Sequence, residues 1–259
     1  MSPENYVGCI LRDIRSETPA CKTFKFDLPR GRALTARPGQ HLLLKLETES
    51  ESFTRQFTIL LPPPQQQHQQ QSDGDGGSPQ RLATFEVLIK LYEGGRASEL
   101  IREWRVGQEA LWRGPFGGFS YERNSFKFVV VLAVGTGTLP MVTAVESLLA
   151  DGEDETRVEV LLGFRSAADL LLGGRWRDIA GFWNVAVELF FSRTTEVVAK
   201  CSFAKAIHPG ARIGLEDILK RAKRSEETMY LVCGTTDFEK SSISTLQAIG
   251  VPADRIKKF

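Results

Sequence analysis

The stretch that most constrains the fold is FVVVLAVGTGTLPM at residues 128–141, an apolar run that ends in a glycine turn. Continuous β-branched residues predict a strand buried on both faces, and hence a parallel sheet. A helical apolar pattern begins near Pro140, and proline suits the first turn of a helix. A strand, a glycine turn and a helix N-terminus can bind a phosphate, because unpaired N–H groups and the helix dipole both favour an anion.

The same stretch is equally compatible with an ordinary strand–turn–helix corner. The dinucleotide fingerprint G-x-G-x-x-G would need a third glycine where Pro140 stands. This segment alone therefore leaves both interpretations open.

The two halves of the chain differ in their patterns. Short strand-like runs punctuated by Pro and Gly fill residues 6–60 and resume at residue 83, as expected of an antiparallel barrel. After Phe126 strand patterns alternate with helical patterns, which is typical of βαβ units and a parallel sheet. We therefore predict two domains, a β-barrel over residues 1–123 and an α/β domain over residues 124–259.

Residues 62–80, PPPQQQHQQQSDGDGGSPQ, form a low-complexity segment inside the first domain. Prolines, a glutamine tract and a Gly/Asp/Ser run cannot form a packed core. We predict a disordered loop inserted between two strands, with His68 solvated. A partner site on the glutamine tract is the alternative.

A second glycine pair, Gly94-Gly95, precedes a short amphipathic helical pattern at residues 99–104. It is a second candidate phosphate cradle, to which Arg96 would add a cation. The alternative is a surface helix capped by Ser98, and the local residues favour that alternative.

Composition narrows the classes of protein. The net charge of +1 gives no global field that would attract nucleic acid or an acidic membrane. No apolar run approaches the roughly 20 residues of a membrane helix, and the N-terminus has no signal pattern, so we expect no membrane segment. The scattered cysteines and histidines predict neither a disulfide framework nor a metal centre. We expect a reducing, cytoplasmic location, with any membrane association through a partner. The residues concerned are Cys9, Cys21, Cys201, Cys233, His41, His68 and His208.

Several motifs occur in an order that resembles a known family. They are RPGQH (37–41), RQFT (55–58), FEVLIKLYEGGRAS (85–98), WRGPFGGFSY (112–121), VGTGTLPM (134–141), VCGTTDF (232–238) and a chain ending on Phe259. Together they resemble the NADH–cytochrome b5 reductases, and their reductase-like subgroup, within the ferredoxin–NADP reductase superfamily. The resemblance implies an antiparallel, FAD-binding β-barrel followed by an α/β parallel-sheet domain that binds NADH or NADPH.

The resemblance also implies roles for residues of the first domain. Arg55 would pair with the FAD pyrophosphate, since a guanidinium matches phosphate oxygens bidentately. Thr58 would place its hydroxyl near flavin N5, the hydride acceptor, as one of two catalytic residues. Phe57 stands where the family has tyrosine. The remaining flavin-binding candidates are Gln56, Leu88, Lys90, Gly95, Arg96, Ala97 and Ser98.

In the second domain the resemblance places the nucleotide phosphates at Gly135, Thr136 and Gly137, with Pro140 following. Cys233, the second catalytic candidate, would face the nicotinamide together with Gly234, and the terminal Phe259 would also contact a cofactor. The alternative for Cys233 is a buried thiol at a strand end.

The nucleotide preference depends on the end of the strand at 187–191. Ser192-Arg193 resembles the Ser-Arg pair of NADPH-using relatives, and Arg165 could join it against a 2′-phosphate. We expect NADPH to be used at least as well as NADH. The alternative is that both arginines are solvated surface charges.

The implied activity is hydride transfer from NAD(P)H to FAD, followed by single-electron transfer to a haem acceptor such as cytochrome b5. One alternative is a ferredoxin- or flavin-reductase type of diaphorase. The other is a non-catalytic module that has lost flavin. The evidence for it is that Phe57, Leu139 and Thr235 differ from the residues that the family usually has at these positions. Basic residues that could dock an acidic haem protein, or could simply be solvated, are Lys200, Lys205, Arg212, Lys220, Arg221, Lys223 and Arg224.

Overall fold

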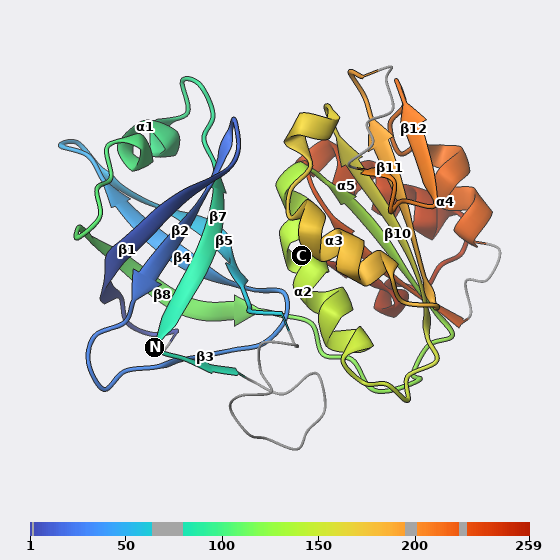
Figure 1. Cartoon of the computed structure of the whole chain (residues 1–259), viewed down its shortest axis with the longest axis horizontal. Coiled ribbons are helices and arrows are strands. Elements are labelled where there is room, and N and C mark those ends of the chain that lie inside the picture. Colours follow the sequence, from blue (N-terminus) through green and yellow to red (C-terminus); the bar gives the residue numbers. More distant parts are fainter. Residues whose placement is uncertain (2, 64–79, 195–200, 223–226) are drawn as a thin grey trace. The chain divides into compact units, whose positions relative to one another are not determined.

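The structure is a computed structural model that describes residues 1, 3–63, 80–194, 201–222 and 227–259. The chain divides into two compact units, Met1–Ser120 and Tyr121–Phe259 (Figure 1). Most of the segment predicted to be disordered, residues 62–80, lies outside the described residues, but residues 62, 63 and 80 are described and Gln80 begins a strand.

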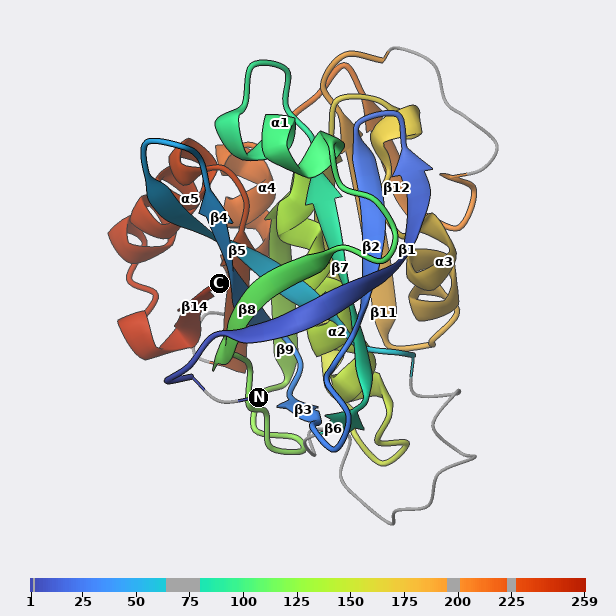
Figure 2. The same ribbon diagram turned by 90° about the vertical axis from the view of Figure 1, so that its left-hand side faces the viewer.

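The first unit is a closed antiparallel barrel, which confirms the predicted fold class. Its strand order is β1-β2-β7-β5-β4-β8, and a short two-stranded sheet of β3 and β6 accompanies it (Figure 2). One helix, α1, follows β7. The elements are β1 Val7–Thr18, β2 Cys21–Asp27, β3 Leu34–Ala36, β4 Gln40–Glu47, β5 Ser52–Leu60, β6 Gln80–Leu82, β7 Thr84–Lys90, α1 Arg96–Arg102 and β8 Glu109–Gly117.

Aromatic rings fill the barrel. Phe26 is fully buried and its ring lies 5.3 Å from Phe85, 5.8 Å from Trp104 and 5.1 Å from Trp112, measured between ring centroids. These pairs stack or meet edge to face, the geometries that aromatic rings prefer. Because inward side chains alternate with outward ones along each strand, the aromatic core determines which residues the barrel presents on its outer surface.

We expect Phe26→Ala to lower the free energy of unfolding of the first unit by about 3–5 kcal/mol, because it leaves a cavity among three rings. Val106→Ala, at an exposed position of the same unit, should change it by less than about 0.5 kcal/mol. Urea denaturation followed by tryptophan fluorescence measures both. Equal effects of the two substitutions would contradict this view of the core.

The second unit is a six-stranded parallel sheet with the order β12-β11-β10-β9-β13-β14. The pair α2 and α3 covers one face, and the pair α4 and α5 covers the other (Figures 1 and 2). The elements are β9 Phe128–Val134, α2 Thr138–Leu149, β10 Arg157–Phe164, α3 Gly173–Ala180, β11 Val185–Phe191, β12 Ala206–Pro209, α4 Leu215–Ala222, β13 Thr228–Cys233, α5 Thr236–Ala248 and β14 Ile256–Lys258.

Strand β9 is central and buried on both faces, as its apolar run predicts. Val130 and Leu132 pack into a cluster with Ile218 of α4 and Leu246 of α5. Val131, on the opposite face, is also fully buried. Burial of alternate residues on both sides is what a helix-covered parallel sheet requires.

Local backbone features set where three helices begin. α2 begins at Thr138, two residues before Pro140, after a short 3-10 turn over Gly135–Gly137. Within residues 166–180, Leu172 has a φ of +54° and separates a 3-10 turn from α3. α5 begins at Thr236, because Thr235 caps it by accepting the Phe238 N–H.

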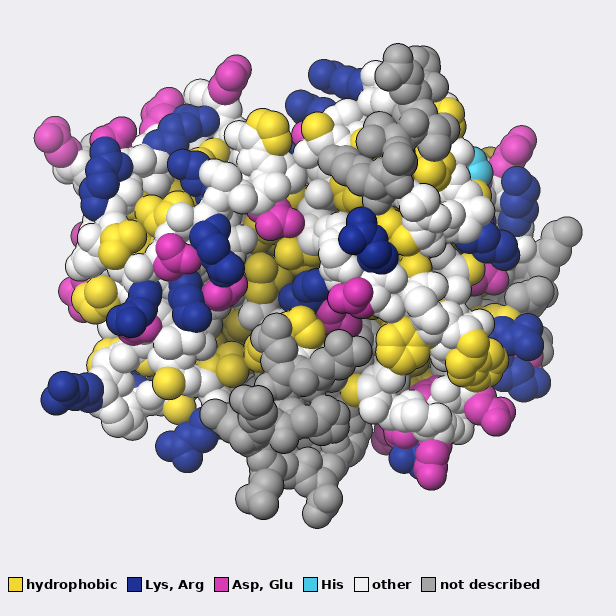
Figure 3. Space-filling view, in the orientation of Figure 1, with side chains coloured by type: hydrophobic (Ala, Val, Ile, Leu, Met, Phe, Trp, Pro, Cys, Tyr) yellow, Lys and Arg dark blue, Asp and Glu magenta, His cyan; other side chains and the backbone are white. Residues whose placement is uncertain are grey.

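Charged side chains of both signs are interspersed over the visible face of each unit (Figure 3). Within the described residues, no helix combines the length and apolar character needed to span a membrane. The same residues contain no group of three or more His, Cys, Asp or Glu side chains that could hold a metal ion.

Candidate functional site

The outer face of the barrel brings together four of the predicted flavin-binding residues. On β7 the core side chains are Phe85, Val87 and Ile89, so Leu88 and Lys90 lie on the opposite face. On β5, Ile59 packs into the core, which places Gln56 and Thr58 on the outer face. The two strands are hydrogen-bonded neighbours, so these four residues share one face of the barrel, on which Leu88 is only 2% exposed.

His41 joins this surface, and sequence reasoning missed it. Its strand β4 pairs with β5 in a register that sets His41 directly opposite Thr58. Burial lowers the pKa of the imidazole, and its ring lies 6.0 Å from that of Phe116. The signal was available, since His41 ends the RPGQH motif that supported the resemblance.

Phe57 does not lie on that surface. Its ring packs against the core and meets Trp112 at an interplanar angle of 67° and a centroid distance of 6.0 Å. Alternation along β5 therefore separates Phe57 from Thr58, and the flavin-stacking role of Phe57 stays a prediction.

The two arginines predicted to bind the FAD pyrophosphate converge on one ring. The guanidinium carbon of Arg96 lies 4.3 Å from the centroid of Phe53, and that of Arg55 lies 4.9 Å from it. Arg96 also forms an ion pair with Glu51, and Arg55 donates to the carbonyl of Thr54. Cations over an aromatic face are attracted by its quadrupole, so Phe53 gathers two positive charges from separate elements.

The glycine loop before α1 contradicts one of the two sequence interpretations, the cap by Ser98, and leaves the phosphate cradle a prediction. Gly94 has a φ of +64°, and Gly95, not Ser98, is the N-cap of α1. Ser98 is buried within the first turn, where its hydroxyl accepts the Tyr92 N–H at 2.9 Å. The expectation of a Ser98 cap is therefore wrong, because the chain turns into the helix three residues earlier. Ala97 packs partly against the core.

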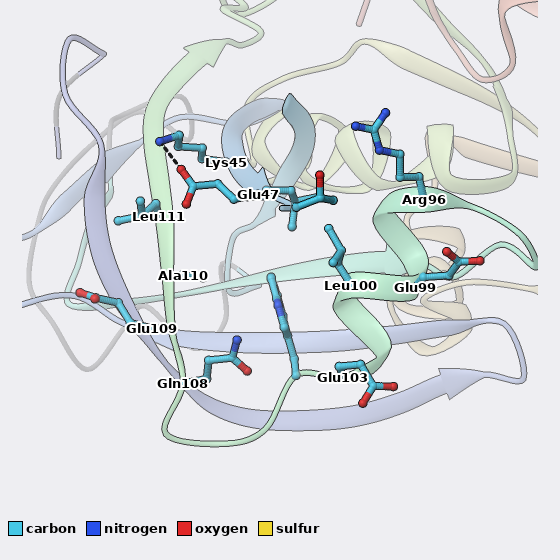
Figure 4. A pocket seen from close by; sticks show the side chains of 13 residues that line it. Lys45, Glu47, Arg96, Glu99, Leu100, Glu103, Gln108, Glu109, Ala110 and Leu111 are labelled. Carbon is cyan, nitrogen blue, oxygen red and sulfur yellow. Dashed lines mark ion pairs between the residues drawn. The ribbon is translucent and has the colours of Figure 1, made fainter. Parts of the chain in front are cut away.

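A pocket of about 730 Å³ opens between α1 and the ends of β4 and β8 (Figure 4). Its lining carries Glu47, Glu99, Glu103 and Glu109 against only Lys45 and Arg96. This excess of carboxylates disfavours an anion such as a pyrophosphate. We therefore place no cofactor phosphate among these carboxylates.

The second unit gathers its predicted residues at one edge of the sheet. The Gly135–Gly137 turn follows β9, Arg165 follows β10, Ser192-Arg193 follows β11, and Cys233-Gly234 ends β13. These strands are neighbours in a parallel sheet, so their carboxyl ends meet. That edge is where open α/β sheets bind ligands.

Two of these motifs touch through their backbones. A Cβ placed on Gly137 would lie 2.4 Å from the carbonyl oxygen of Cys233 and 2.7 Å from the nitrogen of Gly234. Only glycine permits that approach. Gly135 has a φ of +55° and open space within 4 Å of the position where its Cβ would be, so the turn presents backbone to a ligand.

Cys233 and the chain end also lie together. The Cys233 thiol donates to the carbonyl oxygen of Phe259 at 3.9 Å, and the Phe259 N–H donates to the carbonyl of Val232 at 3.2 Å. Burial raises the pKa of the Cys233 thiol to about 12. The group is therefore a neutral thiol at physiological pH, not a thiolate nucleophile.

The two arginines predicted at the 2′-phosphate are neighbours. The Arg193 N–H donates to the carbonyl oxygen of Arg165 at 2.8 Å, extending the β10–β11 pairing beyond both strands. Both side chains are exposed, and the described residues hold no ion pair for either guanidinium. Within the described residues, two exposed cations without an ion pair thus occupy adjacent positions at this edge.

The basic residues proposed for docking lie in different environments. Lys205, Arg212 and Lys220 are exposed. Arg221 is a wrong candidate, because its side chain is 8% exposed and forms ion pairs with Glu159 at 3.1 Å and Glu188 at 2.6 Å. Lys200, Lys223 and Arg224 lie outside the described residues.

These residues fit the implied cofactors. In the first unit, the guanidinium groups of Arg55 and Arg96 and the left-handed Gly94 suit a pyrophosphate. The outer face of the barrel carries both polar and apolar side chains, which suits a flat ring. In the second unit, an open glycine turn before a twelve-residue helix suits a nucleotide phosphate.

Comparison with known proteins supports FAD and a nicotinamide nucleotide as the cofactors. Residues 77–121 match the family model "Oxidoreductase FAD-binding domain", and residues 131–243 match "Oxidoreductase NAD-binding domain". The chain is 31% identical over 260 residues to the NADH-cytochrome b5 reductase-like protein of Mus musculus, covering 98% of this chain and 76% of the relative. Its identity to the Homo sapiens protein of that name is 30%, with the same coverage.

The chain belongs to the NADH–cytochrome b5 reductase family. As a member of this family it is an NAD(P)H-dependent flavoprotein reductase that uses FAD. Solved structures of low identity share the reductase fold. The cytochrome b5 reductase domain of Ulva prolifera nitrate reductase has a TM-score of 0.77 at 20% identity, covering 100% of this chain and 99% of that one. A ferredoxin NADP+ reductase from Neisseria gonorrhoeae with bound FAD and NADP has a TM-score of 0.71 at 17% identity, covering 98% of each chain.

We expect Gly137→Ala in this reductase to weaken nucleotide binding by at least about tenfold, because the new methyl group must push the turn away from the Cys233 carbonyl. Gly152→Ala is the control, since its Cβ would meet nothing within 4 Å. Equilibrium titration with NADH and NADPH measures both. An unchanged dissociation constant in Gly137→Ala would show that the nucleotide binds elsewhere.

Proposed function

We propose that the reductase passes a hydride from NAD(P)H to FAD and then single electrons to a cytochrome b5-type haem protein. In this proposal the first unit holds FAD and the second holds the nicotinamide nucleotide. The observation that carries it is the contact of Gly137 with the Cys233–Gly234 turn, because it joins a phosphate-type turn to a thiol at the ligand edge of a parallel sheet.

For FAD, the barrel supplies charge and a surface. Arg55 and Arg96 would hold the pyrophosphate, with Gly94 and Gly95 allowing backbone to approach it. Gln56, Thr58, Leu88 and Lys90 would line the ring, and the Thr58 hydroxyl would donate a hydrogen bond at its reactive edge. Bound FAD supplies the redox chemistry, accepting two electrons as hydride and releasing them one at a time.

The second unit would orient the nucleotide and would not itself react with it. The turn at Gly135, Thr136 and Gly137 would bind the pyrophosphate before α2, while the half-buried Cys233 and Gly234 would contact the nicotinamide. A thiol that stays protonated presents a small, polarizable surface and excludes water from the reacting carbon. Phe259, whose carbonyl accepts from that thiol, would complete this wall.

The acceptor is inferred from the relatives and from surface charge. Relatives of this chain are named for cytochrome b5, and the exposed Lys205, Arg212 and Lys220 would attract an acidic haem protein. None of the four cysteines, all of which lie in the described residues, forms a disulfide, which supports a reducing, cytosol-facing compartment.

The decisive experiment is an anaerobic titration of the purified protein. It should bind FAD and show the blue-light absorption band of flavin, which NADH or NADPH bleaches and oxidised cytochrome b5 restores. Rising salt should slow the last step. A colourless protein that cannot be reconstituted with FAD would contradict the proposal.

Arg55→Ala should weaken FAD binding by about tenfold or more, because it removes a charge-assisted hydrogen bond to phosphate. Arg12→Ala removes another exposed arginine of the barrel, one paired with Asp27, and should leave FAD affinity unchanged. Flavin fluorescence during reconstitution gives both constants.

We further propose that NADPH is used at least as well as NADH. Arg193 and Arg165 adjoin at the carboxyl ends of neighbouring strands, and no carboxylate among the described residues neutralises them. A 2′-phosphate would form ion pairs with both, whereas the 2′-hydroxyl of NADH gains little from a cation.

Arg193→Ala should lower kcat/KM for NADPH by about tenfold or more and leave kcat/KM for NADH within about twofold. Arg212→Ala is a control for the general loss of an exposed arginine from the same unit. An unchanged ratio of the two kcat/KM values in Arg193→Ala would rule out this role.

A further inference from the structure

Glu239 is a carboxylate in the first turn of α5 whose side chain is only 9% exposed. Withdrawing a charge from water is costly unless partners replace the lost hydration. The partners that Glu239 has therefore indicate what the fold uses it for.

One carboxylate oxygen of Glu239 reaches back past the start of its own helix. It accepts the Gly234 N–H at 3.0 Å. Thr235, the next residue, caps α5 by accepting the Phe238 N–H at 3.4 Å. In an ordinary capping box the returning carboxylate binds the N-cap amide, whereas here it binds the amide one residue earlier. The Cys233–Gly234 turn is thereby fastened to α5.

The other carboxylate oxygen binds the last strand. It lies 2.8 Å from the Nζ of Lys258, which is paired in register with Val232. Strand β14 then continues to Phe259, whose carbonyl accepts from the Cys233 thiol. A single side chain thus joins the turn, the helix and the end of the chain.

The opposite side of the turn packs against the end of β9, with which Cys233 is paired in register. A Cβ on Gly234 would lie 2.3 Å from a methyl carbon of Val134, and one on Gly137 would lie 2.4 Å from the Cys233 oxygen. The turn is therefore confined between the end of β9 on one side and the Glu239 carboxylate on the other.

We propose that Glu239 is a positioning residue that, together with Lys258, sets the placement of the Cys233–Gly234 turn and so the placement of the nicotinamide ring. The second half of this inference rests on the proposed function, because it requires the nicotinamide to contact Cys233. Glu239 itself touches no substrate.

The charges near the thiol agree with this arrangement. After burial, the negative charge of Glu239 is the next largest influence raising the pKa of Cys233, and the positive charge of Lys258 opposes it. The two members of the ion pair therefore act on the thiol in opposite directions. Loss of structure, by contrast, would expose the thiol whichever member was removed.

The first test needs no cofactor. The rate at which iodoacetamide alkylates Cys233 is followed by peptide mass spectrometry from pH 8 to 10.5 in wild type, Glu239→Gln and Lys258→Met. Glu239→Gln should shift the pH–rate profile of Cys233 to lower pH, and Lys258→Met should shift it to higher pH. A shift in the same direction for both, or no shift, would overturn the placement of Glu239 beside the thiol.

The second test separates positioning from binding. In the FAD-loaded enzyme, Glu239→Ala should lower kcat for flavin reduction by about tenfold to hundredfold, because small misplacements of reacting groups are that costly. The dissociation constant of the nucleotide should stay within about twofold, since its phosphates bind at residues 135–137. Glu239→Gln keeps an acceptor for the Gly234 N–H and should recover part of the loss.

Asp237→Asn is the matched control. Asp237 is exposed and lies in the first turn of the same helix, so it tests the loss of a charge at this helix end without loss of the Gly234 and Lys258 contacts. It should change neither the thiol profile nor kcat.

The outcomes distinguish the two proposals. Wild-type protein that binds no nucleotide would refute the proposed function and the nicotinamide half of this inference, while opposite shifts in the thiol profiles would still establish the Glu239 clamp. Wild-type protein that binds and oxidises NAD(P)H normally, with Glu239→Ala showing the same kcat, would refute the inference alone.

Discussion

The contact on which the nucleotide site depends is a close approach of two backbones. Gly137 lies so near the carbonyl of Cys233 that no side chain fits between them. This brings the end of β9 and the end of β13 together at the carboxyl edge of the sheet. Backbone packing of this kind leaves little freedom, because a shift of either strand end would open a gap or cause a collision. A phosphate-type turn and a thiol are consequently held at a constant separation.

Buried charge reinforces this edge of the sheet at Glu239 and the middle of the sheet at Arg221. Glu239 ties the Cys233–Gly234 turn to α5 and β14, and Arg221 ties α4 to the sheet through Glu159 and Glu188. Such groups contribute modest net stability, because desolvation offsets most of their attraction. Their main effect is on geometry, because a buried carboxylate that binds two partners in fixed directions holds the connected elements in one arrangement. Arg221 is buried and ion-paired, which makes it unsuitable for docking and suits it to this structural role.

Sequence patterns that extend over many residues predicted much of the fold. The two-domain architecture, the barrel and the parallel sheet followed from strand runs and their alternation with helical patterns. Helix starts were less predictable: α5 begins at Thr236, and α1 is capped by Gly95 rather than Ser98. Capping depends on which backbone groups the surrounding structure leaves unpaired, and short local sequence does not specify that. The short edge strands β12 and β14 carry too few residues to show a period.

The resemblance to a reductase family implied the residues that would bind FAD and a nicotinamide nucleotide, and by itself the sequence determined the two fold classes and the two glycine turns. It did so because strand and helix periods, and glycine's freedom at positive φ, are local properties. Only the tertiary structure decided that Arg55 and Arg96 share the ring of Phe53, that Arg165 and Arg193 adjoin, and that Glu239 clamps the Cys233 turn. These pairs lie far apart in the chain or depend on burial and register, and such contacts arise only when the strands are assembled.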